Sequence, residues 1–318
     1  MGTKRTIIEE SSKRIAPYLR ETPVERSAWL SSCSDGDVFL KLENFQITGS
    51  FKARGALNKL TSLTAGEREL GVVTASSGNH GAAVAYGSNA LGVDAEVYVP
   101  KSASPAKIAV IKSYGAQVEL FGDDCVETEA RARARAEETG RIYISPYNDE
   151  TVMAGQGTVG VELHRRLETV DAVFVSLGGG GLIGGMGTYL KETLGDVEIV
   201  AVSPEQSPAM HECLEAGKII DVPCFDTLSD GTAGGVELGA ITYEVCAQVV
   251  DRSLLVSEDA IAEAMRTFME KHRMMIEGAA GVALAGFLQV AKDYKGKRVA
   301  IVVCGANISL EKLSGVIK

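Results

Sequence analysis

Lys52 is the first residue whose type and position suggest chemistry. It lies in the segment KLENFQITGSFKARGALNKL (41–60), and the residues that follow it can start a helix. A helix dipole disfavours a cation at the N-terminus, so the field there lowers the pKa of a lysine and makes its amine more nucleophilic. The alternatives are an ordinary surface lysine and, for Ser50, a simple N-cap. Lys52 is therefore a candidate nucleophile whose role depends on its neighbours.

Four consecutive glycines, Gly178 to Gly181, form the second candidate site. They follow the apolar segment AVFVSL (172–177), a predicted strand, and precede LIGGMGTYLKETLG (182–195), a predicted helix. Free backbone amides and the helix dipole at such a place favour an anion. Phosphate is the anion we expect there.

Two other interpretations of the glycines remain open at this point. Gly179, Gly181 and Gly184 satisfy G-x-G-x-x-G, and Glu205 follows the next predicted strand, where a dinucleotide-binding protein places its ribose acid. A nicotinamide dinucleotide is thus a rival ligand. The structural alternative is a tight turn that allows helix and strand to pack closely.

The segment ASSGNHGAA (75–83) is the third candidate site and again joins a predicted strand to a predicted helix. It supplies the polar residues Ser76, Ser77, Asn79 and His80. Backbone amides here can hold a carboxylate, and the Asn79 amide can donate to a ring oxygen. A capped turn is the alternative, in which His80 is a structural histidine.

Alternating strands and helices must position these three segments. Short β-branched runs predict strands buried on both faces; they are GVVTAS (71–76), AEVYVP (95–100), QVELFG (117–122), RIYIS (141–145), AVFVSL (172–177), EIVAVSP (198–204) and VAIVVCG (299–305). Helical spacing is found in 105–114, 127–138 and 258–271. We expect an α/β protein with mainly parallel sheets, which bind ligands beyond the carboxyl ends of their strands, here the loops after Thr74, Leu177 and Val303.

Composition and charge restrict the function classes. The 318 residues include 32 Lys+Arg and 42 Asp+Glu, for a net charge of −10, with 45% hydrophobic residues. This is ordinary globular composition for roughly two domains. The negative charge and scattered cations argue against nucleic acid as a partner, so small molecules are the expected ligands. The charge run RARARAEE (131–138) predicts a solvated helix face.

The cysteines and the N-terminus indicate the compartment. The six cysteines lie far apart with no C-x-x-C, so we expect reduced thiols, most of them packing residues, and neither a zinc site nor a disulfide framework. Apolar stretches such as 279–290 are too short for a membrane helix. The polar start MGTKRTIIEESSKR does not indicate export, so we expect a cytoplasmic protein without a membrane partner.

The three sites together resemble the fold-type II family of pyridoxal-phosphate enzymes, in its threonine/serine dehydratase and serine racemase branch. The matching segments occur in family order along nearly the whole chain: ENFQITGSFKARGA, TASSGNHGAAVA, AGQGTVGVEL, SLGGGGLIGG, EGAAGVALA and CGANIS. The resemblance implies a tryptophan-synthase-β-like fold, with two open, mainly parallel sheets and flanking helices. It also implies pyridoxal 5'-phosphate as cofactor and leaves little room for a dinucleotide.

The resemblance assigns a role to each candidate residue. Lys52 is implied to be the Schiff-base lysine and Asn79 to bond the phenolic oxygen of the cofactor. Gly178, Gly179, Gly180, Gly181 and Leu182 are implied to wrap the phosphate, and Phe51 is a further implied cofactor contact. Glu277 is implied to lie near the substrate side and Cys304 to face the pyridine nitrogen. The implied substrate contacts are Ser76, Ser77, Asn79 and His80. Without the resemblance, Cys304 is a small buried thiol and Glu277 a helix cap.

The implied activity is that of a lyase in amino-acid metabolism. Lys52, freed from the cofactor by substrate, can remove the Cα proton as general base, after which the β-hydroxyl leaves. The products are a 2-oxo acid and ammonia, as expected of a threonine or serine dehydratase (ammonia-lyase). Racemisation is the alternative, because Ser77 occupies the family position for an acid or base on the second face. Dehydratases of hydroxyaspartate or phenylserine, and a catalytically silent amino-acid-binding regulator, also remain open.

Two departures from the family pattern bear on metals and regulation. Members that bind a divalent cation carry Val-Glu-Pro after the strand, whereas this chain has Ser203, and Ala209 stands at the later ligand position. Hard cations need carboxylate ligands, so we expect no metal, although the shifted Glu205 is an alternative ligand. The chain ends at Lys318, so we expect the short catabolic type without a regulatory domain.

We expect two domains and a homodimer. The predicted large cofactor-binding domain comprises residues 1–50 and 149–318, and the small domain comprises residues 51–148, with the cofactor in the cleft between them. Family resemblance implies the homodimer, which is also the commonest form of soluble oligomer.

Overall fold

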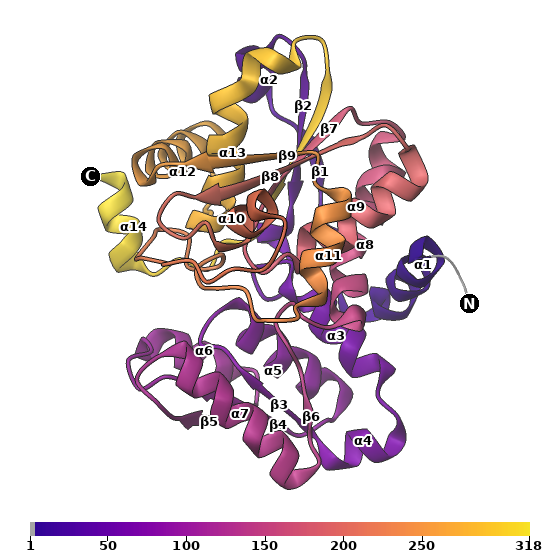
Figure 1. Cartoon of the computed structure of the whole chain (residues 1–318), viewed down its shortest axis with the longest axis vertical. Coiled ribbons are helices and arrows are strands. Elements are labelled where there is room, and N and C mark those ends of the chain that lie inside the picture. Colours follow the sequence, from indigo (N-terminus) through magenta and orange to yellow (C-terminus); the bar gives the residue numbers. More distant parts are fainter. Residues whose placement is uncertain (1–3) are drawn as a thin grey trace.

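Two β-sheets surrounded by helices make up the structure, a computed structural model that describes residues 4–318 (Figure 1). Met1, Gly2 and Thr3 of the polar N-terminal segment lie outside the described residues. The strands are β1 (Val24–Arg26), β2 (Asp37–Leu42), β3 (Val72–Ala75), β4 (Ala95–Val99), β5 (Gln117–Leu120), β6 (Ile142–Tyr143), β7 (Ala172–Ser176), β8 (Glu198–Pro204), β9 (Arg252–Val256) and β10 (Arg298–Val303).

The helices alternate with these strands, as the sequence predicted. They are α1 (Lys4–Ile15), α2 (Ala28–Ser34), α3 (Lys52–Ser62), α4 (Ala65–Leu70), α5 (Asn79–Leu91), α6 (Pro105–Ser113), α7 (Cys125–Thr139), α8 (Glu150–Leu167), α9 (Gly181–Leu194), α10 (Ala209–Ala216), α11 (Ile241–Val249), α12 (Glu258–His272), α13 (Gly278–Val290) and α14 (Leu310–Ile317). Short 3₁₀ helices are η1 (Ala16–Tyr18), η2 (Glu43–Phe45) and η3 (Ala291–Tyr294).

The larger sheet has the strand order β1-β2-β10-β7-β8-β9. Only β1 is antiparallel to its neighbour; the other pairs are parallel. The carboxyl ends of β2, β7, β8 and β10 therefore meet at one edge. That edge carries Glu43 after β2, the glycine segment after β7 and Cys304 after β10.

The smaller sheet has the order β5-β4-β3-β6, and all its pairs are parallel. Its strand β3 ends at Ala75, so the serine and asparagine loop leaves its carboxyl edge and leads directly into α5. The α/β fold class with two open, mainly parallel sheets is thus confirmed. All four strands of the smaller sheet lie between residues 72 and 143, inside the predicted small domain, whose boundaries stay a prediction.

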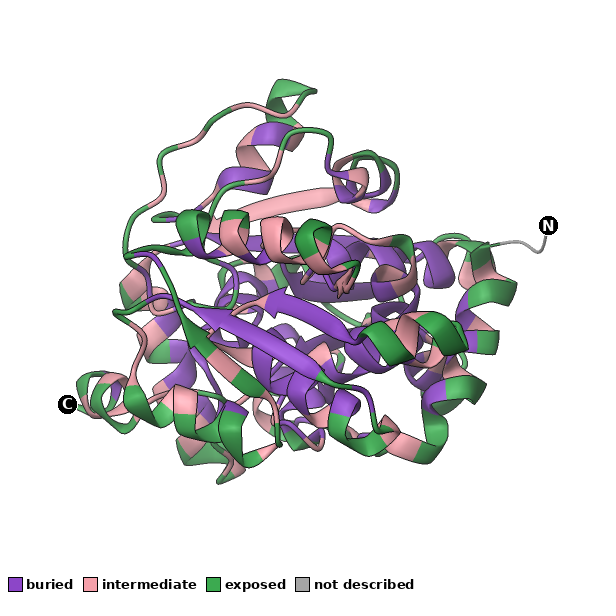
Figure 2. Ribbon diagram, turned by 90° about the horizontal axis from the view of Figure 1, so that it is seen from below, coloured by how far each residue is buried: buried purple, intermediate pink, exposed green. Residues whose placement is uncertain are grey.

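Burial explains which strands the sequence revealed. The strands β4, β7 and β10 are almost completely buried, and Figure 2 shows buried strands enclosed by helices whose outer faces are exposed. Helix α13 is apolar all round because it packs against β7, β8, β9 and β10 on one side and α12 on the other. Its Gly286 lies so close to β8 that an added Cβ would stand 2.5 Å from a Val202 methyl group.

Some sequence predictions about the fold are wrong. Strand β5 is largely exposed rather than buried on both faces, because it lies at the edge of the smaller sheet. The strands β1, β2 and β9 were missed; β1 and β9 are the two edge strands of the larger sheet, and polar residues interrupt β2. The charge run of α7 is not simply solvated, since Arg133 pairs with Glu237 at 2.9 Å and Arg135 with Glu96 at 2.9 Å.

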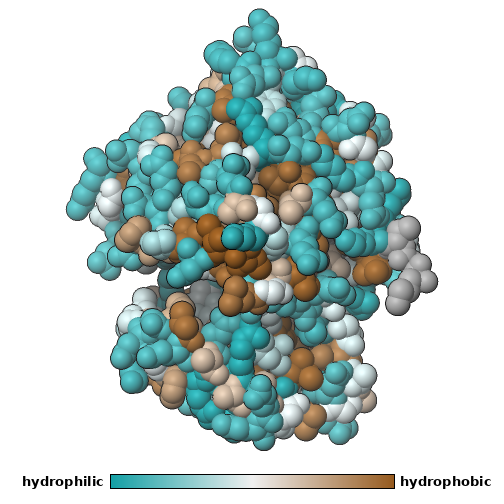
Figure 3. All heavy atoms as spheres, viewed as in Figure 1, coloured by the Kyte–Doolittle hydropathy of each residue, from teal (hydrophilic) through white to brown (hydrophobic). Residues whose placement is uncertain are grey.

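A long loop, residues 217–240, joins α10 to α11. Its Asp230 contacts Lys107 of α6 at 3.2 Å and its Glu237 contacts α7, so ion pairs connect the loop to the helices of the smaller sheet. Phe225 and Leu238 of the loop are exposed, and Figure 3 shows hydrophobic residues gathered on this face of the molecule. Within residues 4–318, no helix is long and apolar enough to span a membrane.

Candidate active site

Lys52 is the first residue of α3, as the sequence predicted. Its Nζ donates to the carbonyl oxygen of Pro146 at 2.7 Å and lies 5.2 Å from the centre of the Phe51 ring. The partly buried position lowers the pKa of Lys52 to about 8, although the electrostatic influence of Cys304 and Glu277 opposes this shift. A lysine of this kind is neutral far more often at pH 7 than an exposed one, so its amine is available as a nucleophile or base.

The segment before Lys52 is attached to the end of β10. The backbone N–H of Phe51 donates to the carbonyl of Cys304 at 3.0 Å, and Ser50 forms a bridge with Gly305. Ser50 is not an N-cap, because Phe51 occupies that position, so the capping alternative is wrong. Its buried Oγ has no hydrogen-bond partner within the described residues. The structure thus brings Lys52 and Cys304 to one place.

Cys304 is buried directly after β10. The Ser176 hydroxyl at the end of β7 donates to its Sγ at 3.6 Å. Burial raises the pKa of the Cys304 thiol, and nearby Glu277 raises it further, so the thiol keeps its proton. A neutral thiol here can donate or accept a weak hydrogen bond.

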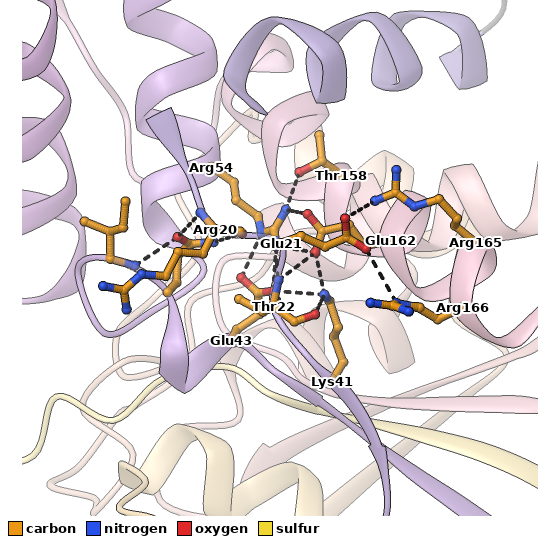
Figure 4. Close-up of polar contacts among 12 residues, drawn as sticks. Arg20, Glu21, Thr22, Lys41, Glu43, Arg54, Thr158, Glu162, Arg165 and Arg166 are labelled. Carbon is orange, nitrogen blue, oxygen red and sulfur yellow. Dashed lines mark hydrogen bonds and ion pairs between the residues drawn. The ribbon is translucent and has the colours of Figure 1, made fainter. Parts of the chain in front are cut away.

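A buried ion network holds the first turns of α3 in place (Figure 4). Arg54, two residues after Lys52, contacts Glu43 at 2.8 Å and Glu162 of α8 at 2.8 Å. Lys41 of β2 adds a contact with Glu162 at 2.5 Å and donates to the carbonyl of Thr22 at 2.8 Å. Because these residues come from β2, η2, α3 and α8, the network fixes the helix that carries Lys52 relative to the larger sheet.

The glycine segment forms a cradle between other chain segments. Gly180 has φ +83°, a conformation that favours glycine, and α9 begins at the next residue. An added Cβ on Gly179 would stand 2.5 Å from the Tyr147 ring, and one on Gly178 would stand 2.8 Å from Cα of Thr232. The tight-turn alternative explains the packing, but the first N–H groups of α9 also lack partners within the helix. The segment therefore has the geometry of an anion site.

Asn79 begins α5 and faces Glu277, which precedes α13. The Asn79 Nδ2 lies 2.8 Å from Oε1 and 3.1 Å from Oε2 of Glu277, and the Asn307 backbone N–H donates to Oε2 at 2.9 Å. Glu277 occupies the N-cap position of α13, but its side chain makes no capping hydrogen bond to that helix. Burial raises the pKa of Glu277 to about 7, while the N–H groups of Asn79 and Asn307 oppose this shift.

The remaining predicted substrate residues lie around the start of α5. Ser76 and Ser77 are partly buried in the loop after β3, where the Ser76 Oγ accepts from the Gly78 N–H at 3.2 Å. The His80 side chain is buried and its Nε2 lies 3.0 Å from the Ile144 carbonyl. Burial, assisted by the charge of Lys52, lowers the pKa of His80 to about 3, so the ring is neutral. Its Nδ1 is buried and has no hydrogen-bond partner within the described residues.

The proposed cation position has no carboxylate. Ser203 is buried and donates to the Leu177 carbonyl at 3.1 Å, while Ala209 starts α10. Glu205 is exposed. Residues 4–318 contain no group of three or more His, Cys, Asp or Glu side chains that could hold a metal ion. The absence of a metal stays a prediction.

Sequence reasoning missed several residues of the site. Tyr147 covers the glycine segment, and its hydroxyl accepts from the Glu237 N–H at 3.2 Å. Asn307 and Arg54 lie inside the motifs CGANIS and ENFQITGSFKARGA, yet neither received a role. A charged residue two positions from a candidate catalytic lysine, on a helix with an apolar face, is the one sequence clue that pointed to Arg54.

An amine of lowered pKa beside an anion cradle defines a site for a phosphate ester that carries a carbonyl group. Comparison with known proteins agrees. A family model described as pyridoxal-phosphate dependent enzyme matches residues 15–305, and the chain belongs to this family. The dinucleotide alternative is therefore wrong.

The most similar proteins include dehydratases and racemases. L-threonine dehydratase catabolic TdcB of Staphylococcus aureus (strain USA300) is 40% identical over 315 residues, covering 98% of this chain and 91% of the relative. Serine racemase from Dictyostelium discoideum is 34% identical with a TM-score of 0.90, covering 97% of this chain and 99% of the other. The processed form of threonine deaminase isoform 2 from Solanum lycopersicum is 31% identical with a TM-score of 0.93, covering 98% and 92%.

The residues present fit pyridoxal phosphate. The cradle of Gly178 to Gly181 and the start of α9 suit its phosphate, and Lys52 suits its aldehyde. The buried Oγ1 of Thr242, which adjoins Gly180, and the buried Oγ of Ser50 have no partner within the described residues. These orphaned hydroxyls stand where a polar ligand would satisfy them.

Proposed function

We propose that this protein is a pyridoxal-phosphate dependent ammonia-lyase that eliminates water from L-threonine, L-serine or both, giving a 2-oxo acid and ammonia. The observation that carries the proposal is Lys52, whose lowered pKa and single carbonyl partner leave its amine available beside the cradle. The similarity to the threonine dehydratase of S. aureus over 98% of the chain supports the same reaction class.

The cofactor, when bound, supplies an electron sink that stabilises negative charge at Cα of the amino acid. Lys52 Nζ takes the Cα proton as general base, and its pKa near 8 suits this transfer close to neutral pH. The Asn79 N–H would bond the phenolic oxygen, and the glycine cradle would hold the phosphate. Cys304, which keeps its proton, would be a neutral partner of the pyridine nitrogen.

The same site supplies the contacts to the amino-acid substrate. Ser76, Ser77 and the backbone N–H groups of Asn79 and His80 at the start of α5 bind its carboxylate, because a helix N-terminus favours an anion. Leu182 and Phe51 complete the walls around the cofactor. Glu277, whose pKa is near 7, accepts a hydrogen bond from the side-chain NH₂ of Asn79.

Serine racemisation is the second candidate function. Ser77 lies in the loop that faces the cofactor position in this assignment, where a hydroxyl can return a proton to the face opposite Lys52. The likeness to the D. discoideum serine racemase, with a TM-score of 0.90, favours this candidate. Dehydration of a bulkier or acidic 3-hydroxy amino acid uses the same residues with a different side-chain pocket.

Cofactor-loaded protein incubated with L-threonine, L-serine and L-threo-3-hydroxyaspartate tests these alternatives. We expect 2-oxobutyrate and equimolar ammonia from threonine, pyruvate from serine, and no product with Lys52→Ala. Chiral chromatography for D-serine measures racemisation, which Ser77→Ala should abolish while elimination persists. A protein that binds the cofactor but forms neither 2-oxo acid nor D-amino acid would contradict an enzymatic role.

We also propose the large and small domains with the boundaries given above, a homodimer, and a cytoplasmic location. The separate sheets support the domain division. The six free cysteines suit a reducing compartment. Sedimentation analysis of the purified protein tests the dimer.

A further inference from the structure

Asn307 connects three parts of the site through one side chain. It follows β10, three residues after Cys304, and is exposed at the rim of the site. Its Nδ2 donates to the Thr48 carbonyl at 2.8 Å and to the Asn79 Oδ1 at 2.5 Å. Its backbone N–H donates to Glu277 at 2.9 Å. One residue thus contacts the segment before Lys52, the start of α5 and the acid before α13.

These hydrogen bonds have a fixed direction. The Thr48 carbonyl can only accept, so the side-chain NH₂ of Asn307 must face it. The second hydrogen of that NH₂ then points to Asn79, which must present its Oδ1. The Asn79 Nδ2 is consequently turned to the opposite side, toward Glu277.

The reversed orientations are all unfavourable. Turning Asn79 alone would bring its Nδ2 against the NH₂ of Asn307 and its Oδ1 against the Glu277 carboxyl group. Turning both amides would set Oδ1 of Asn307 against the Thr48 carbonyl oxygen. Each reversal places donor against donor or acceptor against acceptor, so one arrangement of the chain of bonds is strongly preferred.

The backbone holds Asn307 in reach of Thr48. The Ala306 N–H donates to the Gly49 carbonyl at 2.9 Å, and the Phe51 N–H donates to the Cys304 carbonyl. These two bonds join the segment before Lys52 to the segment after β10. Gly49 has φ +73°, and an added Cβ there would stand 2.7 Å from Oδ1 of Asn307. The glycine is therefore needed both for the turn and for the close approach of Asn307.

We propose that Asn307 is a positioning residue that turns the Asn79 amide so that its N–H, rather than its carbonyl oxygen, faces the phenolic oxygen of the cofactor. This inference rests on the proposed function, which assigns that contact to Asn79. It also says what fixes the orientation of the Asn79 amide. The Thr48 carbonyl sets the orientation of the Asn307 amide, and the Asn307 amide in turn sets that of Asn79.

The isosteric variant Asn307→Asp tests the inference, because it replaces the donating NH₂ by an acceptor of the same shape. A hydrogen bond donated to the phenolic oxygen favours the ionised form, which absorbs visible light. We expect Asn307→Asp to lower the ratio of visible to near-ultraviolet cofactor absorbance by about tenfold. Its dissociation constant for pyridoxal phosphate, measured by equilibrium dialysis, should rise by roughly 10- to 100-fold.

Asn307→Ala and Asn89→Asp are the matched controls. Asn307→Ala leaves Asn79 free to turn, so its effects should have the same direction and be several-fold smaller. Asn89 is exposed near the other end of α5, and the same chemical change there should alter neither quantity. Wild-type spectrum and affinity in both Asn307 variants would overturn the inference. A wild-type protein without visible absorbance would instead refute the proposed function.

A crystal structure of the wild-type holoenzyme decides the matter if the variants do not fold. We expect the Asn307 side chain to stay within hydrogen-bond distance of both Thr48 O and Asn79. An Asn307 that contacts neither of them while Asn79 bonds the phenolic oxygen would overturn the inference.

Discussion

Helix α3 begins with two charged side chains, Lys52 and Arg54, which differ in whether an ionic partner is present. At Arg54 the ion network is complete: Arg54 contacts Glu43 and Glu162, and Lys41 contacts the same two carboxyl groups. At Lys52, two residues earlier, one carbonyl oxygen accepts from Nζ. Paired charges hold the helix in place, whereas the charge without an ionic partner is available for chemistry.

The two carboxyl groups of these regions show the same contrast. Burial by itself raises the pKa of both Glu43 and Glu277. The cations Arg54 and Lys41 overcome this effect and lower the pKa of Glu43, whereas the neutral N–H partners of Glu277 leave its pKa at about 7. Burial alone therefore does not mark a functional group; the charge of its partners decides.

Lys52→Ala should have the largest effect on activity. Removing the Lys52 amine removes both the cofactor linkage and the base, so 2-oxo acid formation from threonine should fall by more than about 10³-fold. Thermal stability should be unchanged, because no ionic partner is left behind. Steady-state kinetics and calorimetry measure the two quantities, and a variant that retains a tenth of the activity would place the base elsewhere.

Arg54→Met should have the largest effect on stability. It leaves Glu43 and Glu162 buried with too few cations, so the free energy of unfolding should fall by about 3–5 kcal/mol. Urea denaturation measures the change. Arg26→Met is the matched control, since the exposed Arg26–Asp37 pair should contribute less than about 1 kcal/mol. Equal effects of the two variants would contradict a structural role for the network.

Glu277→Gln should change the pH dependence of stability in the cofactor-free protein. The folded pKa of Glu277, about 7, exceeds its ordinary value of 4.5, so its contribution is full below about pH 4.5 and is lost as the pH rises through 7. Wild type should therefore lose about 3 kcal/mol relative to Glu277→Gln across this range. Chemical denaturation at several pH values provides the measurement.

Glu43→Gln is the control for that experiment and should show the opposite sign. The folded pKa of Glu43 lies below its ordinary value, so its contribution is present above about pH 4.5 and disappears as the pH falls. Glu43→Gln should therefore be destabilised at neutral pH and approach wild type in acid. The same sign for both variants would end the distinction between the two regions.

Lys107→Met should have the smallest effect. The partly exposed Lys107–Asp230 pair joins α6 to the loop over the site, so its loss should raise KM for the amino acid by up to about fivefold with little change in kcat. Added salt should abolish the difference from wild type. Lys101→Met, which removes the exposed Lys101–Asp123 pair of the smaller-sheet region, should leave KM unchanged.

Local patterns predicted the parts of this molecule that depend on local physics. Continuous apolar runs revealed the buried strands, and glycines after β7 revealed the cradle. Edge strands such as β1 have no continuous apolar run. They have a neighbouring strand on one side only and are more exposed to solvent. The contact between Asn307 and Asn79 joins residues 228 positions apart, and the Arg54 network joins four elements, so neither could be derived from spacing.

Reduction of the cofactor-loaded protein with borohydride, followed by peptide mapping, tests the central claim most directly. The reagent makes the lysine–cofactor linkage permanent, so mass spectrometry identifies the lysine. We predict that the added mass lies on Lys52 alone and that Lys41, which is fully paired with carboxylates, carries none. Label on Lys41 or on another lysine, or no label in protein that has bound the cofactor, would contradict the account.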